Sequence, residues 1–183
     1  MTATINQRDR FIGVAFVAAA VVIQIAIMGI AIMALNVGLL IALGFWLTGG
    51  WQQSERKRTA LWFAIGLACF IAHFAEEWSA GLDHELPGLL GYQWPEALFV
   101  AFNASWFALF VAAVFAVWFQ LRLGYLVLLF FAIGGGVLNG VGHVLIAIVL
   151  GRYFPGLYTA PLMLAVGIQL LRIVYPPRVA RGA

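Results

Sequence analysis

Long apolar runs separated by short polar segments dominate this chain of 183 residues. A membrane-spanning helix needs about 20 mainly apolar residues, and six runs approach that length. The pattern therefore predicts an all-α bundle with helices at about 11–30, 34–50, 59–79, 96–119, 123–148 and 158–175.

The first apolar run, 11–50, is too long for one crossing. As a single helix it would extend about 60 Å, twice the thickness of the hydrocarbon layer. We therefore expect a helical hairpin over 1–50 that turns near Asn36. A polar loop at 51–58 follows it, and a longer polar loop at about 80–95 joins the third and fourth spans.

Composition supports a membrane protein. Hydrophobic residues make up 64% of the chain and the mean hydropathy is +1.02, whereas soluble domains contain roughly 45–50% apolar residues. The apolar run after Arg10 is much longer than the core of a signal peptide, about 7–15 residues, so we expect a retained span. With Cys69 as the only cysteine, the chain has no internal disulfide and no multi-cysteine metal site. We expect a single transmembrane domain over 1–183.

The basic residues indicate topology rather than nucleic-acid binding. In the six-span arrangement nine of the ten Lys and Arg residues lie on one side, and Arg152 is the exception. By the positive-inside rule this side, with both termini and the 51–58 loop, is cytoplasmic. A five-span arrangement ranks second because it puts the N-terminal arginines outside. Arg152 has three interpretations: an interfacial anchor, a partner of Glu76 or Glu77, or a ligand of an anionic headgroup.

Ionisable residues interrupt the third span at its outer end. His73, Glu76 and Glu77 are spaced i, i+3 and i+4 and so share one helical face. Helix rise places Asn103 of the fourth span, and Asn139 and His143 of the fifth, in the same outer third of the bilayer. Because ionisable groups inside a membrane are costly and usually functional, these residues predict one site.

The residue types fit a metal site. His73 and Glu77 can bind one ion from adjacent helical turns, and His143 can supply a third ligand. A His₂Glu set binds Zn²⁺ with an open position for water, which would leave Glu76 free as a general base. Such a donor set also suits other divalent metals.

A metal-free interpretation uses the same residues. One glutamate would act as acid or base with His73 or His143 as its partner. Asn103 and Asn139 would orient the substrate or donate to an oxyanion. This pairing of glutamate, histidine and asparagine resembles the CAAX-type intramembrane proteases, although their E-E-x-x-x-R motif is absent.

Three short motifs together resemble a known family. HFAEE (73–77), NGVGH (139–143) and YFPG (153–156) occur in the order found in the HxxEE family of bacterial integral membrane proteins. The resemblance covers about 59–175, a four-helix core, and leaves the 1–50 hairpin as an addition. It implies a shared site, a membrane enzyme and a location in the bacterial inner membrane.

Three functions fit these features. The first is a membrane-embedded hydrolase acting on a lipid or peptide from the outer leaflet, with Zn²⁺ as its possible cofactor. The second is an acid–base isomerase or cyclase of a sterol-like or isoprenoid-like lipid, similar in style to the sterol isomerase family, because aromatic side chains can stabilise a cation. Its cavity would be lined by Trp62, Trp78, Trp106 and Phe107. The third is a non-enzymatic protein that binds a metal or a lipid.

Overall fold

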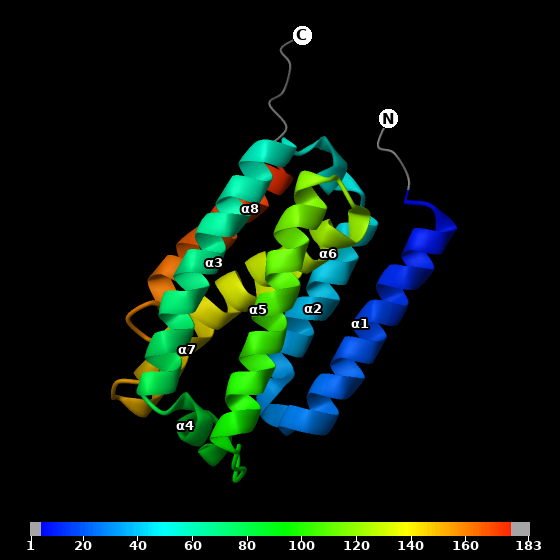
Figure 1. The fold of residues 1–183 in the computed structure, drawn as a ribbon. Helices are drawn as coiled ribbons and strands as arrows, with labels where there is room; N and C mark the ends of the chain where they lie inside the picture. The colour runs from blue at the N-terminus through cyan, green and yellow to red at the C-terminus, as the bar shows by residue number, and fades with distance from the viewer. Residues whose placement is uncertain (1–4, 177–183) are drawn as a thin grey trace.

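The computed structural model describes residues 5–176, and this part of the chain is helical with no strand. The all-α prediction is confirmed. The elements are α1 (Gln7–Met28), η1 (Gly29–Ile32), α2 (Met33–Leu47), η2 (Gly50–Gln53), α3 (Arg56–Ser79), α4 (Leu82–Gly88), α5 (Glu96–Trp118), α6 (Arg122–Phe130), η3 (Phe131–Leu138), α7 (Asn139–Leu150) and α8 (Ala160–Val174). The long helices form an elongated bundle, and α4 crosses one end of it (Figure 1).

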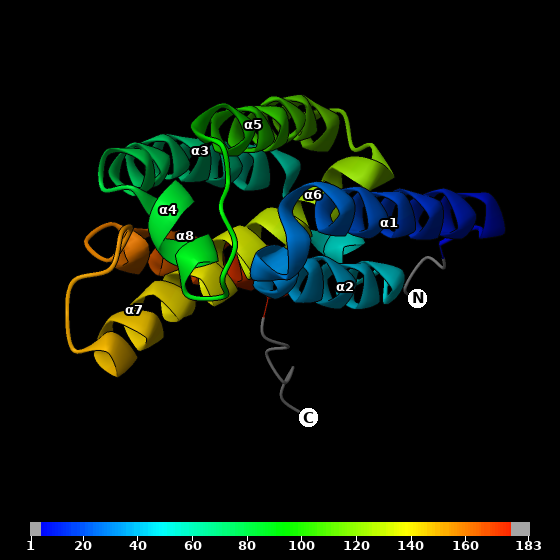
Figure 2. The same cartoon turned by 90° about the horizontal axis from the view of Figure 1, so that it is seen from below.

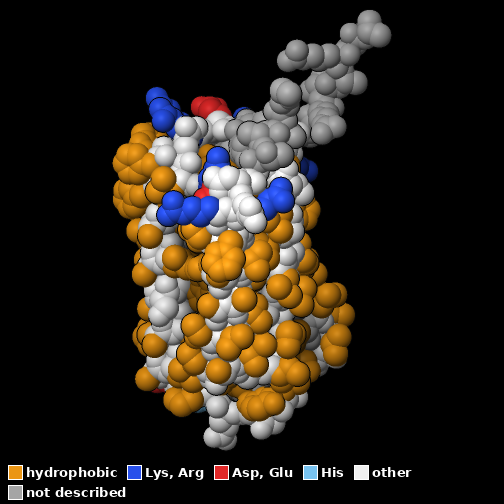
Figure 3. Space-filling view, turned by 90° about the vertical axis from the view of Figure 1, so that its right-hand side faces the viewer, with side chains coloured by type: hydrophobic (Ala, Val, Ile, Leu, Met, Phe, Trp, Pro, Cys, Tyr) orange, Lys and Arg blue, Asp and Glu red, His pale blue; other side chains and the backbone are white. Residues whose placement is uncertain are grey.

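Four helical segments are long and apolar enough to cross a membrane. They are Gln7–Leu47, Arg56–Ser79, Glu96–Trp118 and Arg122–Leu150, while the apolar helix α8 is shorter. The surface along the bundle is largely hydrophobic, and Lys and Arg side chains gather at the end near the chain termini (Figure 3). A band of exposed apolar side chains is what lipid tails require, so the fold is that of a helical membrane protein.

The first of these segments folds back on itself, as Figure 2 also shows. Gly13 in α1 lies against Trp46 in α2, where an added Cβ would come 2.6 Å from the indole ring. The turn is η1, so the turn predicted near Asn36 is wrong: Asn36 is buried within α2. Gly29 makes the reversal possible because its φ of +69° suits a residue without a Cβ.

The predicted 80–95 loop is also partly wrong, since it contains α4. Gly81 follows α3 with a φ of +79°, and α4 then packs across the end of the bundle that is far from the termini (Figure 1). Arg152 Nη2 lies 2.6 Å from Glu85 Oε2 in α4. Arg152 therefore pairs with neither Glu76 nor Glu77, and its ion pair links α4 to the segment that we call the 151–159 loop.

A π-helical segment, η3, interrupts the predicted fifth span. Its glycines allow close backbone contact: an added Cβ on Gly136 would lie 2.7 Å from Gly167 Cα in α8, and one on Gly134 would meet the ring of Phe130. Such segments occur frequently at functional sites, because the wider turn redirects the helix beyond it. Here the segment ends immediately before Asn139, the first residue of α7.

The two ends of the bundle differ in charge. At the end near the termini, Arg122 pairs with Asp9 and so joins the first residues of α6 to α1. Arg178 and Arg181, which the sequence assigns to the same end, lie outside the described residues. The opposite end carries the acidic residues of α3, α4 and α5.

Candidate metal centre

The HFAEE motif occupies the last turns of α3 and faces α7. His73 and Glu77 are buried on one side of α3, and His143 is buried on the facing side of α7. One donor atom from each of these residues lies within 4.8 Å of the other two. We call these three residues the triad.

The spacing within the triad matches a shared metal ion. Glu77 Oε1 lies 3.1 Å from His73 Nε2 and 3.0 Å from His143 Nε2. Two ligands bound tetrahedrally to zinc at 2.0–2.1 Å would lie about 3.3 Å apart. The two distances from Glu77 need to open by only a few tenths of an ångström to match this geometry.

Hydrogen bonding determines which nitrogen of His73 carries a proton. Thr159 Oγ1 lies 2.6 Å from Glu76 Oε2 and must donate there, because a carboxylate can only accept. The same hydroxyl oxygen lies 2.7 Å from His73 Nδ1, so it accepts from Nδ1–H. Nε2 therefore carries a lone pair, which can accept from the Asn139 amide 2.7 Å away. Glu77 Oε1, 3.1 Å from the same nitrogen, is also an acceptor, so this contact becomes favourable with a cation between the two atoms, either a metal ion or a second proton.

Glu76 faces away from the triad, towards the 151–159 loop. Its carboxylate accepts four hydrogen bonds, from the Tyr153 hydroxyl (2.8 Å), the Tyr158 amide (2.9 Å), the Thr159 amide (2.8 Å) and the Thr159 hydroxyl (2.6 Å). Thr159 also precedes α8, whose N-terminus favours a negative charge. In this structure the Glu76 carboxylate is therefore bound by the 151–159 loop rather than directed at the triad, and its role as a general base stays a prediction.

The YFPG motif closes over the triad. Gly156 has a φ of +89°, and an added Cβ would lie 2.6 Å from His143 Cε1 and 3.0 Å from His73 Cε1. Phe154 is buried with its ring centroid 5.6 Å from that of His143. The motif thus supplies a hydroxyl for Glu76 and a glycine that lets the loop approach both histidine rings.

Tyr153 should remain protonated well into the alkaline range. Burial, followed by its hydrogen bond to the negatively charged Glu76, raises the pKa of Tyr153 to about 12 from an ordinary 10.0. Because the folded-state pKa is the higher, the stability from this group is complete below about pH 10 and is lost as pH rises towards 12. Absorbance titrations of the wild type and of Tyr153→Phe should show the same amount of phenolate up to about pH 11, because Tyr153 is still protonated there. Extra phenolate in the wild type below that pH would contradict its hydrogen bond to Glu76.

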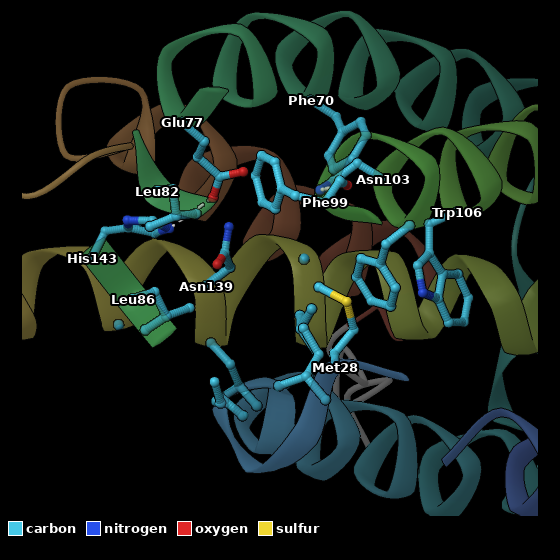
Figure 4. Close-up of a pocket in the computed structure, with 18 of the residues that line it drawn as sticks. Met28, Phe70, Glu77, Leu82, Leu86, Phe99, Asn103, Trp106, Asn139 and His143 are labelled. Atoms are coloured by element: carbon cyan, nitrogen blue, oxygen red, sulfur yellow. Dashed lines mark hydrogen bonds and ion pairs between the residues drawn. The ribbon is translucent and has the colours of Figure 1, made fainter. Parts of the chain in front are cut away.

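The two predicted asparagines occupy different positions. Asn139 Nδ2 lies 2.7 Å from His73 Nε2, beside the triad. Rotating the side-chain amide of Asn139 by 180° exchanges its nitrogen and oxygen, so it can present either an N–H donor or a ligand oxygen to the triad. Asn103 instead donates to the backbone oxygen of Phe99. It lies deeper in the same cavity, and the Phe99 ring stands between it and Glu77 in Figure 4.

A cavity of about 150 Å³ opens from the triad into the bundle. Its wall is mostly apolar, and Trp106 is one of its aromatic residues, whereas Trp62, Trp78 and Phe107 do not line it. Trp78 points outward instead and donates to Glu96 Oε1 at 2.8 Å.

Thr159 was missed as a site residue, because it lies at the start of the predicted helix at 158–175, where the sequence shows no other sign of a role. Its contact with His73 spans 86 positions. The only sequence signal was the nearby YFPG motif.

Comparison with protein families agrees with these motifs. The family described as "Protein of unknown function with HXXEE motif" matches residues 62–170. The chain belongs to the HXXEE family. The HXXEE match extends from α3 to α8 and so contains the whole triad and the 151–159 loop, while the α1–α2 hairpin precedes it. Neither a curated protein nor a solved structure matches the chain.

Proposed function

We propose that this HXXEE protein is a metal-dependent hydrolase embedded in the membrane, with His73, Glu77 and His143 holding one Zn²⁺. One observation carries the proposal: the unprotonated Nε2 of His73 lies 3.1 Å from a buried carboxylate that also contacts His143. Two neutral imidazoles and one carboxylate are a common catalytic zinc set, with a fourth position left for water or substrate.

Each residue has a defined part in the proposed chemistry. A divalent ion would supply a Lewis acid that polarises a carbonyl and activates water. Asn139, beside His73, can donate to the oxyanion that develops on the substrate. Glu76 and Thr159 are positioning residues, because they hold the His73 ring in the tautomer that binds metal.

The proposal includes an orientation in the membrane. The end that carries Arg8, Arg10 and the 51–58 segment would be cytoplasmic under the positive-inside rule. The folded-back α1–α2 hairpin and the apolar α8 would complete six crossings, with both termini inside. The triad would then lie near the outer face, and for a bacterial protein the membrane would be the inner one.

A second candidate, an acid–base isomerase or cyclase of a lipid, is favoured by the aromatic wall of the cavity. Without a metal, a second proton on His73 would satisfy Glu77 and could be passed to an alkene, whose cation aromatic rings would stabilise. The non-enzymatic alternative, simple binding of a metal or a lipid, uses the same residues.

Metal analysis of the detergent-purified protein separates these candidates. We expect close to one zinc per chain, measured by mass spectrometry, and almost complete loss in the double variant His73→Ala, Glu77→Ala. Glu96→Gln is the matched control, because this exposed carboxylate lies at the same end of the bundle outside the triad. A wild-type protein that stays free of metal after reconstitution with zinc would overturn the proposal and favour acid–base chemistry.

A further inference from the structure

The cavity beside the triad is polar at one end and apolar along the rest. Glu77, Asn139 and His143 lie together where α3 and α7 face each other, and Figure 4 shows Phe70 and Trp106 at the far side. Two of the helices that border the cavity carry a polar residue at one end and an aromatic residue further inside the bundle. On α3, Phe70 lies two turns inward from Glu77. In the continuous helical segment formed by α6, η3 and α7, Phe130 lies inward from His143.

The cavity is long and narrow. The α5 residues that line it run from Phe99 to Phe110, which is about 16 Å at 1.5 Å per residue. Its volume is about 150 Å³, close to that of an engineered apolar cavity that holds one benzene molecule, so it has room for about six carbons. A space of this shape suits a flexible hydrocarbon chain better than the fused rings of a sterol.

The wall also argues against a peptide. Each peptide residue carries a backbone donor and an acceptor, and burying them without partners is costly. Beyond the triad and Asn139, the polar groups of the lining are the Asn103 amide and the indole N–H groups of Trp94 and Trp106. The Asn103 amide nitrogen already donates to Phe99 O and the Trp94 indole to Met28 O. A hydrocarbon chain has no such groups to satisfy.

We propose that the triad acts on an acyl lipid whose single hydrocarbon chain enters this cavity with its first carbons, so that its carbonyl carbon lies beside Glu77 and His143. This inference rests on the proposed hydrolase function and names its substrate class. In the reaction, the oxygen of a water molecule bonds to the acyl carbon while the bond to the leaving oxygen or nitrogen breaks. The leaving atom takes up a proton from that water, so the products are a fatty acid and an alcohol or amine.

A groove on the lipid-facing surface provides a path into the cavity. It runs between α1 and α5, and Phe102 and Trp106 line both the groove and the cavity. Gln24 lines the groove as well. It is 3% exposed, and both polar atoms of its side chain are without partners among the described residues. A lipid entering sideways would pass this amide, which can bond to its ester or headgroup oxygen.

A blocking variant tests the inference independently of catalysis. Gly135 lines the cavity, and a Cβ added there meets only Phe131 at 4.0 Å, so Gly135→Leu should fold and fill the space. Gly44→Leu is the matched control on α2, because Gly44 has nothing within 4 Å and does not line the cavity. The probe is a palmitic acid analogue carrying a photoreactive diazirine on its chain, added to protein in phosphatidylglycerol–phosphatidylethanolamine nanodiscs.

We expect the analogue to label the cavity face of α5 between Phe99 and Phe110. Labelling should fall about tenfold in Gly135→Leu, which corresponds to about 1.4 kcal/mol of binding, and should match the wild type in Gly44→Leu. Equal labelling of Gly135→Leu and the wild type, or competition by a hydrophobic peptide as strong as that by unlabelled palmitate, would overturn the inference.

Labelling of Glu77→Gln separates the two proposals. This variant should keep the labelling by the analogue, because Glu77 lies at the polar end of the cavity rather than along its apolar length. If the wild type binds zinc but is not labelled by the palmitic acid analogue, the lipid substrate is wrong and the hydrolase proposal is unaffected. If the wild type is labelled by the analogue but binds no zinc, the cavity binds a hydrocarbon chain and the proposed zinc hydrolase is wrong.

Discussion

Replacing Gly156 with alanine is expected to abolish zinc binding by the triad. The added Cβ would lie 2.6 Å from His143 Cε1 and 2.7 Å from His143 Nδ1, against a normal separation of about 3.5–4.0 Å. The loop or the ring must therefore move by about 1 Å, whereas a metal site tolerates roughly 0.2 Å in its bond lengths. Zinc content after purification and zinc affinity in a chelator competition are the measurements.

Gly151→Ala is the control for backbone strain in the same loop. Gly151 also has a left-handed φ, +63°, but an added Cβ there meets nothing within 4 Å. Both alanines carry a left-handed conformational cost of about 1–2 kcal/mol, and only the one at Gly156 contacts the histidines. If both variants lose zinc equally, loop strain is the cause. If Gly156→Ala binds zinc like the wild type, the loop does not set the triad geometry.

The helices and the triad could be predicted because both follow from helix geometry. The i and i+4 spacing of His73 and Glu77 fixes them on one face, whatever the surroundings. A constant rise per residue brought His143 to the same depth, although π-helix η3 precedes it. Errors of a few residues in the ends of the helices did not matter, because the outer third of the bilayer spans several residues.

The other features of the fold and the site depend on turns and loops, whose sequences have no regular hydrophobic periodicity. The turn of the first hairpin lies at η1, where Gly29 adopts a left-handed conformation, and a single buried Asn36 was a misleading signal. The role of Glu76 depends on the path of the 151–159 loop, which no repeat pattern determines. Glu76 and Glu77 are neighbours in sequence but face different parts of the site, because consecutive helical positions point about 100° apart.

Hydrogen bonding distinguishes the two glutamates. Glu76 has four donors to its carboxylate and is the kind of fully satisfied group that organises a structure. Glu77 is buried, and among the described residues its carboxylate pairs with the two histidines, one of which turns an unprotonated nitrogen towards it. Inside a membrane an incompletely satisfied carboxylate is costly, so its persistence there favours a bound cation.

Substituting Glu76 by glutamine should weaken zinc binding by about 10–100-fold, the usual cost of losing a residue that orients a metal ligand. Each carboxylate oxygen of Glu76 now meets two donors, and an amide nitrogen in either place cannot accept them. With the amide nitrogen facing Thr159, the hydroxyl oxygen would accept a hydrogen bond from the glutamine amide, and the hydroxyl would donate its own to His73 Nδ1 instead. The remaining proton of His73 would then sit on Nε2, where it blocks the metal.

A general base at this position predicts a different result. If Glu76 activated water, the Glu76→Gln variant would bind zinc normally and lose only turnover. Zinc affinity therefore decides between the two roles, and the nitrogen chemical shifts of His73 report its tautomer directly. Thr159 supplies the paired test: Thr159→Ser keeps the hydroxyl that links Glu76 to His73 and should bind zinc like the wild type, whereas Thr159→Val should weaken zinc as Glu76→Gln does. Normal zinc affinity in both Glu76→Gln and Thr159→Val would show that the link from Glu76 to His73 has no part in metal binding.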